Sequence, residues 1–175
     1  MKNFLNTEKI FLTFMKNIFI TGGAGYVGGF LTDLLLSDGY DVTIYDNLLY
    51  ETRFLKDVDF VYGDVRDYDK LSPLVNRFDI IIALAAIVGD EACAVNPYTT
   101  RAINVDSIRW LTENFKGKII FPSSCSVYGA NNDLLDESAA TNPLSLYAQT
   151  KLEAEKIIFS SPYADTHLVL RLGTL

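Results

Sequence analysis

A tyrosine and a lysine four positions apart, Tyr147 and Lys151, are the residues of this chain whose types and spacing most directly suggest chemistry. On a helix this spacing places both side chains on one face, so an ammonium lies beside a phenol. The positive charge favours the phenolate and lowers the tyrosine pKa toward a value suited to proton transfer at neutral pH. Ser124, at the end of an earlier predicted strand, is suited to hold the reacting hydroxyl. The three residues predict a proton-transfer site, although the Tyr/Lys pair alone fits an amphipathic helix surface equally well.

A glycine-rich turn follows the first predicted strand, with glycines at Gly22, Gly25 and Gly28. In a dinucleotide-binding turn the first glycine permits the tight turn. The second lets the backbone approach a pyrophosphate, and the third lets helix and strand pack closely. The helix N-terminus then faces the negative charge. Because such turns also end ordinary strands, the triplet needs support from its surroundings.

That support comes from Asp46, which follows the second predicted strand at the position where a carboxylate accepts hydrogen bonds from an adenosine ribose. A carboxylate also repels a 2′-phosphate, so we expect NAD in preference to NADP, with Arg53 nearby as the feature that favours NADP. Taken by itself, Asp46 could equally be an ordinary turn residue that precedes Asn47. Asp64 and Val65 end the third predicted strand and are expected to face the adenine edge, although Asp64 alone fits a strand cap.

The elements that position these residues alternate between strand and helix patterns. The predicted strands are Asn17–Thr21, Asp41–Tyr45, Val58–Tyr62, Asp79–Ala86, Lys118–Phe121 and His167–Leu172, and the predicted helices are Tyr26–Ser37, Asp67–Asn76, Pro97–Phe115 and Leu146–Phe159. The unbroken apolar run Asp79–Ala86 is typical of a strand covered on both faces. We therefore predict an α/β fold, a doubly wound parallel sheet of Rossmann type, with ligands beyond the carboxyl ends of the strands.

Composition and charge restrict the class of protein further. About half of the residues are hydrophobic, and the net charge of -7 without a dense Lys/Arg cluster argues against nucleic acid as a partner. No sustained apolar run indicates a membrane span or a signal peptide. Cys93 and Cys125 lie far apart and show no metal-ligand spacing, so we expect no metal and a cytoplasmic location.

The N-terminal segment 1–15 is interpreted as an extension to the domain formed by residues 16–175. Met1-Lys2-Asn3-Phe4 is nearly repeated as Met15-Lys16-Asn17-Ile18, which makes Met15 the favoured natural start. The alternative is an N-terminal arm that packs on a partner.

The motifs together resemble the extended short-chain dehydrogenase/reductase family, its NAD-dependent epimerase/dehydratase group, from Lys16 to Leu175. The matching segments, in the family's order, are the glycine turn Thr21–Gly28, Asp46-Asn47-Leu48, Gly63-Asp64-Val65, Leu84-Ala85-Ala86, Asn104-Val105, Ser123–Gly129 and Tyr147-x-x-x-Lys151.

The resemblance implies NAD as cofactor and a nucleotide-sugar as substrate. It implies that Tyr147 is the general base, that Lys151 binds the nicotinamide ribose and lowers the tyrosine pKa, and that Ser124 orients the substrate hydroxyl. Asn104 is similar to the family's helix asparagine that supports a proton relay. The remaining implied cofactor contacts are Asn47; Tyr26 and Val27, over the pyrophosphate; and Leu84, Ala85 and Ala86, with the loop that follows them beside the cofactor.

Two departures from the family pattern bear on the reaction. First, Ala83 stands where many relatives have His. Second, relatives continue past the position that matches Leu175 into a small substrate-binding domain, which we expect to be absent here. Relatives that act as 4,6-dehydratases carry an Asp-Glu pair where this chain has Cys125 and Ser126. We therefore expect an epimerase that works through transient oxidation to a keto-sugar, with a one-way reductase or dehydrogenase as the alternative.

Other classes of function stay open at this stage. A non-catalytic dinucleotide-binding module or an inactive gene fragment would also fit a chain without a substrate domain. Relatives often dimerise through the helices Pro97–Phe115 and Leu146–Phe159, so we expect a homodimer. His167 is expected to be structural, and Cys125 is expected to serve packing because no base accompanies it.

Overall fold

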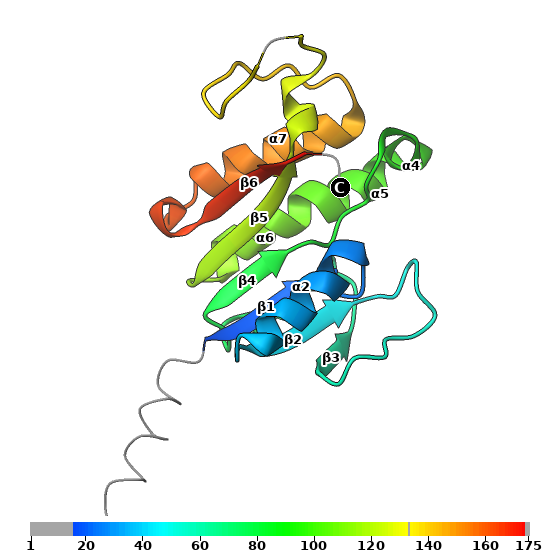
Figure 1. The fold of residues 1–175 in the computed structure, drawn as a ribbon, viewed down its shortest axis with the longest axis vertical. Coiled ribbons are helices and arrows are strands. Elements are labelled where there is room, and N and C mark those ends of the chain that lie inside the picture. The colour runs from blue at the N-terminus through cyan, green and yellow to red at the C-terminus, as the bar shows by residue number, and fades with distance from the viewer. Residues whose placement is uncertain (1–15, 133, 174–175) are drawn as a thin grey trace, which may run out of the picture.

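The computed structural model describes residues 16–132 and 134–173, and these form a six-stranded parallel sheet with helices on both faces (Figure 1). The strand order is β3-β2-β1-β4-β5-β6, and every neighbouring pair is parallel. This is the doubly wound arrangement predicted from the sequence. The expectations for residues 1–15 lie outside the described residues.

The elements follow one another as alternating strands and helices. They are β1 (Asn17–Thr21), α2 (Tyr26–Ser37), β2 (Asp41–Asp46), β3 (Asp59–Tyr62), α3 (Tyr68–Val75), β4 (Ile80–Ala83), α4 (Asp90–Val95), α5 (Pro97–Arg101), the π-helix η1 (Ala102–Asp106), α6 (Ser107–Asn114), β5 (Lys118–Ser124), the 3₁₀-helix η2 (Cys125–Tyr128), α7 (Leu146–Phe159), the 3₁₀-helix η3 (Ala164–Thr166) and β6 (Leu168–Leu172).

Alternating strand residues feed two separate cores. In β1, Phe19 points into the core that α3, α6 and α7 cover, whereas Ile18 and Ile20 point into the core that α2 covers. Figure 1 accordingly shows α2 on the near face of the sheet and α6 and α7 on the far face. On the near face of the edge strand β6, Leu168 and Leu170 are 39% and 40% exposed. The apolar side of this edge strand is thus partly exposed.

Two predicted elements differ from the observed ones. The predicted strand Asp79–Ala86 ends at Ala83, because the chain then leaves the sheet to pass over Gly22, where Ala85 makes a close backbone approach. The predicted helix Pro97–Phe115 is divided into α5, η1 and α6, since one π-helical turn interrupts the regular hydrogen bonding. Helix α4 was not predicted from the sequence.

The strand order reverses between β1 and β4, which are direct neighbours although β2 and β3 lie between them in the sequence. Loops from the carboxyl ends of these two strands diverge to opposite sides of the sheet and leave a crevice there. The glycine turn follows β1, and the loop 84–89 follows β4. The topology alone therefore brings these two segments together.

No helix among the described residues is long and apolar enough to cross a membrane.

Candidate active site

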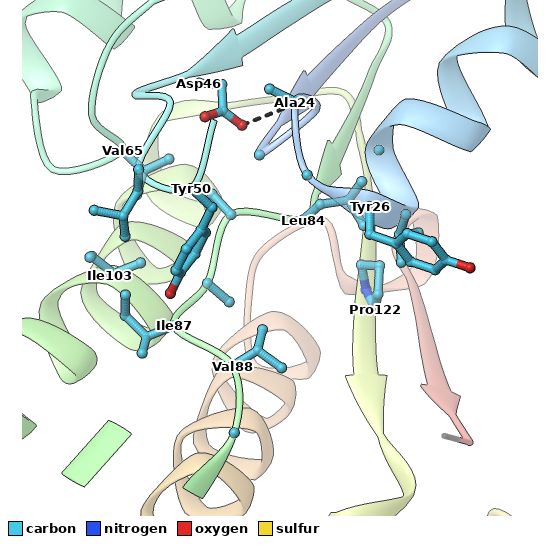
Figure 2. A pocket seen from close by; sticks show the side chains of 18 of the residues that line it. Ala24, Tyr26, Asp46, Tyr50, Val65, Leu84, Ile87, Val88, Ile103 and Pro122 are labelled. Carbon is cyan, nitrogen blue, oxygen red and sulfur yellow. Dashed lines mark hydrogen bonds between the residues drawn. The ribbon is translucent and has the colours of Figure 1, made fainter. Parts of the chain in front are cut away.

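A cavity of about 660 Å³ lies at this crevice, above the carboxyl ends of the strands (Figure 2). Its size falls in the range of sites that enclose organic ligands. Its lining includes fifteen of the sixteen residues predicted for the site: Gly22, Gly25, Tyr26, Val27, Gly28, Asp46, Asn47, Asp64, Val65, Leu84, Ala85, Ala86, Ser124, Tyr147 and Lys151. The glycine turn and the Tyr/Lys pair, which are far apart in the sequence, thus face one cavity.

The glycine turn has the geometry of a cradle that side chains would fill. Gly22 has φ +74°, and a Cβ atom built on it would lie 2.5 Å from the backbone nitrogen of Ala85. A Cβ on Gly28 would lie 2.6 Å from the Cα of Gly23, so α2 begins in close contact with the turn. These approaches leave backbone and the α2 N-terminus facing the cavity, which fits a dinucleotide pyrophosphate. The exposed Tyr26 ring lies across the cavity from Asp46 and is directed outward (Figure 2).

The carboxylate of Asp46 is held in place at the end of β2 by backbone groups on two sides. Its Oδ2 accepts a hydrogen bond from the Ala24 N–H at 3.0 Å (Figure 2). Its Oδ1 accepts one from the Leu48 N–H at 2.7 Å. Each carboxylate oxygen has a second lone pair, so the group can still accept hydroxyl hydrogen bonds. An oriented carboxylate beside a glycine turn fits the two hydroxyls of an adenosine ribose.

The loop after β3 carries a second fixed carboxylate. Asp64 accepts hydrogen bonds from the Arg66 guanidinium at 2.8 and 2.7 Å and from the Asn47 amide at 3.2 Å. The hydrogen bond from Arg66 is the main reason why the pKa of Asp64 falls to about 2. Below the loop, the buried Tyr45 hydroxyl donates to the Asp64 carbonyl oxygen at 2.9 Å. Burial, followed by the charges of nearby acidic groups, raises the pKa of Tyr45 to about 12.

Lys151 is a buried residue of α7. Its Nζ donates a hydrogen bond to the Pro122 carbonyl oxygen at 2.8 Å and lies 4.6 Å from the centroid of the Phe121 ring. The side chain is 5% exposed, and this burial lowers the pKa of Lys151 to about 8. The ammonium is therefore still mostly protonated at pH 7 and loses its proton as the pH rises through about 8.

The expected lowering of the Tyr147 pKa is wrong for the chain without ligands. Burial raises the pKa of Tyr147, because the phenolate would lose hydration, while the neighbouring Ser124 hydroxyl acts in the lowering direction. Lys151 lies 5.9 Å from the centroid of the Tyr147 ring and directs a hydrogen bond to Pro122 instead. The phenol thus holds its proton at neutral pH unless further positive charge is brought near it.

An ion pair, not predicted from the sequence, ties together the elements behind this site. Glu155, one helical turn beyond Lys151, is 2% exposed and accepts hydrogen bonds from the Arg171 guanidinium, the shortest at 2.7 Å. The Ser123 hydroxyl donates to the same carboxylate. Arg171 also donates to the Tyr128 hydroxyl at 3.0 Å. The pair therefore joins α7, β5, η2 and β6 directly beside Ser124.

Asn104, the sixteenth predicted residue, lies behind the cavity wall. Its amide oxygen accepts a hydrogen bond from the Ile87 N–H at 2.8 Å, and its amide nitrogen donates to the Ile87 carbonyl at 2.9 Å and to the Thr150 hydroxyl at 3.2 Å. Asn104 sits in the π-helical turn η1, a feature that is frequent at functional sites. In this structure it fixes the loop 84–89 against α7.

Two remaining sequence-based interpretations can be compared with the structure. The interpretation of Cys125 as a packing residue is wrong, because its side chain is exposed and lines the cavity at the start of η2. His167 accepts a hydrogen bond from the Ile119 N–H at 3.2 Å, and burial lowers its pKa, so it acts as a neutral link between β5 and the segment before β6.

Several cavity residues were missed by sequence reasoning, and most of them follow a strand end. They include Leu49, Tyr50, Glu51, Ile103 and Pro122. The rule that ligands bind beyond the carboxyl ends of parallel strands would have directed attention to them. Glu155 was also missed, although its spacing of four from Lys151 continues the Tyr147–Lys151 face of the helix.

The fold and the cavity together define a Rossmann-type dinucleotide-binding domain with a Ser/Tyr/Lys set at one end of the ligand crevice. Residues 18–172 match the model of the NAD dependent epimerase/dehydratase family. The chain belongs to this family.

Individual relatives agree with this membership. The chain is 34% identical over 170 residues to a putative UDP-glucose 4-epimerase of Methanocaldococcus jannaschii, covering 90% of this chain and 55% of the relative. It is 31% identical over 122 residues to a UDP-N-acetyl-alpha-D-glucosaminuronate decarboxylase of Bacillus cytotoxicus, covering 65% and 38%. A crystal structure of UDP-glucose 4-epimerase from Brucella ovis in complex with NAD matches with a TM-score of 0.81 and 29% identity, covering 89% of this chain and 51% of that one. The chain thus spans about half the length of these relatives or less.

Proposed function

We propose that this chain is the cofactor-binding and proton-transferring part of an NAD-dependent nucleotide-sugar epimerase. The observation that carries the proposal is the convergence of the glycine turn, Asp46 and the Ser124–Tyr147–Lys151 set on one cavity. A dinucleotide-binding module without catalytic activity would need the first two features and not the third. The likeness to UDP-glucose 4-epimerases supports UDP-linked hexoses as the substrates to test first.

The residues at the carboxyl end of β1 and β2 would bind the adenosine half of NAD. The backbone of the glycine turn receives the pyrophosphate, and Asp46 receives the ribose hydroxyls and disfavours a 2′-phosphate. When bound, NAD supplies the hydride acceptor that makes a reversible oxidation of the sugar feasible.

The residues at the other end of the cavity would move the proton. Tyr147 takes the proton of the reacting sugar hydroxyl and returns it, and Ser124 holds the oxygen of that hydroxyl by a hydrogen bond. Because burial raises the pKa of Tyr147, proton removal depends on positive charge that arrives with the ligands or stays on Lys151. With its pKa lowered to about 8, Lys151 is mostly charged at pH 7 and loses this role above pH 8.

Transient oxidation followed by reduction is favoured over water elimination. The cavity residues after Ser124 are Cys125 and Ser126, and neither is a carboxylic acid that would serve as the additional acid of a dehydratase. A one-way dehydrogenase is the second candidate, since its first step would use the same three residues. The two reactions differ in a simple readout, because only the dehydrogenase accumulates NADH.

The test is turnover of UDP-glucose and UDP-galactose by the protein that contains this chain, with Tyr147→Phe compared with Tyr163→Phe. Tyr163 precedes η3, at the amino end of β6, and is not among the residues that line the cavity, so it serves as the matched control. We expect Tyr147→Phe to abolish turnover and to leave the affinity for NAD within about twofold of the parent protein. The parent protein should turn over the sugar without accumulating NADH. Turnover that survives Tyr147→Phe would refute the assignment of the base.

We also propose that the protein forms a homodimer in the cytoplasm through α5, α6 and α7. The apolar Tyr98 on α5 and Phe159 on α7 are 88% and 58% exposed, and Arg101 of α5 pairs with Glu153 of α7 at 2.7 Å, so the two helices present one joint surface. Light scattering after size-exclusion chromatography tests the dimer. A monomer at micromolar concentration would contradict it.

A further inference from the structure

Tyr50 is a large aromatic side chain that stands at the cavity and is not explained by the fold. It lies in the loop between β2 and β3, lines the cavity and is 73% exposed. Figure 2 shows its ring extending from the Asp46 side of the cavity toward Ile87, beside Val65. Its ring is therefore largely free to contact a ligand that enters the cavity.

The loop backbone just before Tyr50 is held by two side-chain hydrogen bonds. Leu48 has φ +54°, a conformation that residues other than glycine rarely adopt. The Leu48 N–H is bonded to Asp46, and the Leu49 N–H donates to the Asn47 side chain at 3.2 Å. Each of the two side chains thus holds the backbone two residues ahead. The same carboxylate that is placed to receive a ribose therefore also holds the backbone that leads to Tyr50.

The wall next to the ring is apolar. Val65, Ile87 and Ile103 line this part of the cavity, and Figure 2 shows all three around the Tyr50 ring. An aromatic ring among aliphatic side chains makes this part of the cavity lining apolar. A purine is a planar ring system that stacks well on aromatic side chains, and a base joined to a ribose held by Asp46 would lie at the same end of the cavity as Tyr50 (Figure 2).

We propose that Tyr50 is a cofactor-binding residue whose ring stacks on the adenine of NAD, with Val65 on the opposite side of the base. The inference rests on the proposed function in that it takes NAD as the ligand of the cavity. It adds a base-contacting residue that lies outside the glycine turn and outside the Ser/Tyr/Lys set. Because stacking uses the ring face, the Tyr50 hydroxyl is not required.

Titration calorimetry with NAD and with AMP tests the proposal on the full chain. AMP contains the adenine, one ribose and one phosphate, and it lacks the nicotinamide half. We expect Tyr50→Ala to weaken the binding of both ligands by the same factor, about 5- to 150-fold, which is the range for a base stacked on an aromatic side chain. Tyr50→Phe should bind within about twofold of the parent chain, and Tyr50→Leu should fall between Phe and Ala.

Tyr163→Ala is the matched control, because it removes an exposed tyrosine before η3 that does not line the cavity. It should leave the affinities for NAD and for AMP unchanged. Unchanged affinity in Tyr50→Ala, or a loss for NAD without a loss for AMP, would overturn the stacking proposal and leave the proposed function intact. A parent chain that binds neither ligand would overturn both. Loss of turnover in Tyr147→Phe is measured separately and does not depend on Tyr50.

Discussion

Replacing Arg171 by methionine should destabilise the chain strongly, although Arg171 is not a residue of the proposed proton-transfer set. Arg171 supplies the guanidinium that surrounds the Glu155 carboxylate through contacts of 3.1, 3.2 and 2.7 Å. The Glu155 side chain is 3% exposed and the Arg171 side chain 18%. Removing the arginine leaves a carboxylate that is buried and has lost its countercharge.

The expected magnitude follows from this burial. Breaking a buried ion pair by removing one partner costs about 3–5 kcal/mol, because the remaining charge lacks both water and compensation. The Ser123 hydroxyl still donates to Glu155 and recovers part of the loss, so we expect a value near the lower bound. The double variant Glu155→Met, Arg171→Met removes both charges and should lie within about 2 kcal/mol of the parent chain, because an apolar pair of similar volume often replaces a buried ion pair without loss.

Urea unfolding followed by circular dichroism at pH 7 measures both quantities in the 175-residue chain. Arg101→Met is the control, since Arg101 also pairs with a glutamate but has a side chain that is 45% exposed. It should cost less than about 1 kcal/mol, as exposed ion pairs do. A loss below 1 kcal/mol in Arg171→Met, or a double variant that is less stable than Arg171→Met, would refute the reasoning.

Three further predictions concern the cofactor end of the cavity. Gly22→Ala should abolish NAD binding and should lose more stability than Gly39→Ala. Both glycines have positive φ, but a Cβ at Gly22 would meet backbone atoms, whereas a Cβ at Gly39 would meet open space. Equal losses in the two variants would contradict the geometry described for the glycine turn. Asp46→Asn should weaken NAD binding and reduce the preference for NAD over NADP at least about tenfold, a change of about 1.4 kcal/mol that competition calorimetry resolves. The folded pKa of Tyr45, about 12, lies above the unfolded value near 10, so the stability that Tyr45 contributes is present below pH 10 and is lost as pH rises toward 12. Tyr45→Phe should therefore remove about 2–3 kcal/mol of alkaline destabilisation, and a parallel stability-versus-pH curve for the variant would show that Tyr45 does not titrate in this way.

Local patterns in the sequence were sufficient for the sheet and for bringing nearly all of the predicted site residues to one cavity. Glycines at 22, 25 and 28 and the acid at Asp46 each follow a strand, and in a parallel sheet all strand ends of one kind meet at one edge. The position of Tyr147 above that edge also follows from the connectivity. Helix α7 connects the parallel neighbours β5 and β6, begins near the carboxyl end of β5 and packs against that strand. The pattern of strands and helices thus carried the argument from residues to a shared cavity.

Features that depend on tertiary packing were beyond the sequence. The end of β4 at Ala83 is set by the close approach of the following chain to Gly22, and an apolar run gives no sign of it. Whether the pKa of Tyr147 rises or falls depends on how deeply its ring is buried and on how near the Lys151 ammonium lies. A spacing of four residues reveals neither quantity. Glu155 and Arg171 likewise look like surface charges until α7 and β6 are packed together.

The central claim is that one NAD molecule spans the cavity from Asp46 to Tyr147, and a crystal structure of the chain grown with NAD tests it most directly. The account predicts adenosine ribose hydroxyls within hydrogen-bonding distance of Asp46, the pyrophosphate on the turn Gly22–Gly28, and the nicotinamide ribose beside Tyr147 and Lys151. A nicotinamide ring that lies outside the cavity, or an adenosine bound at the Tyr147 end, would contradict it.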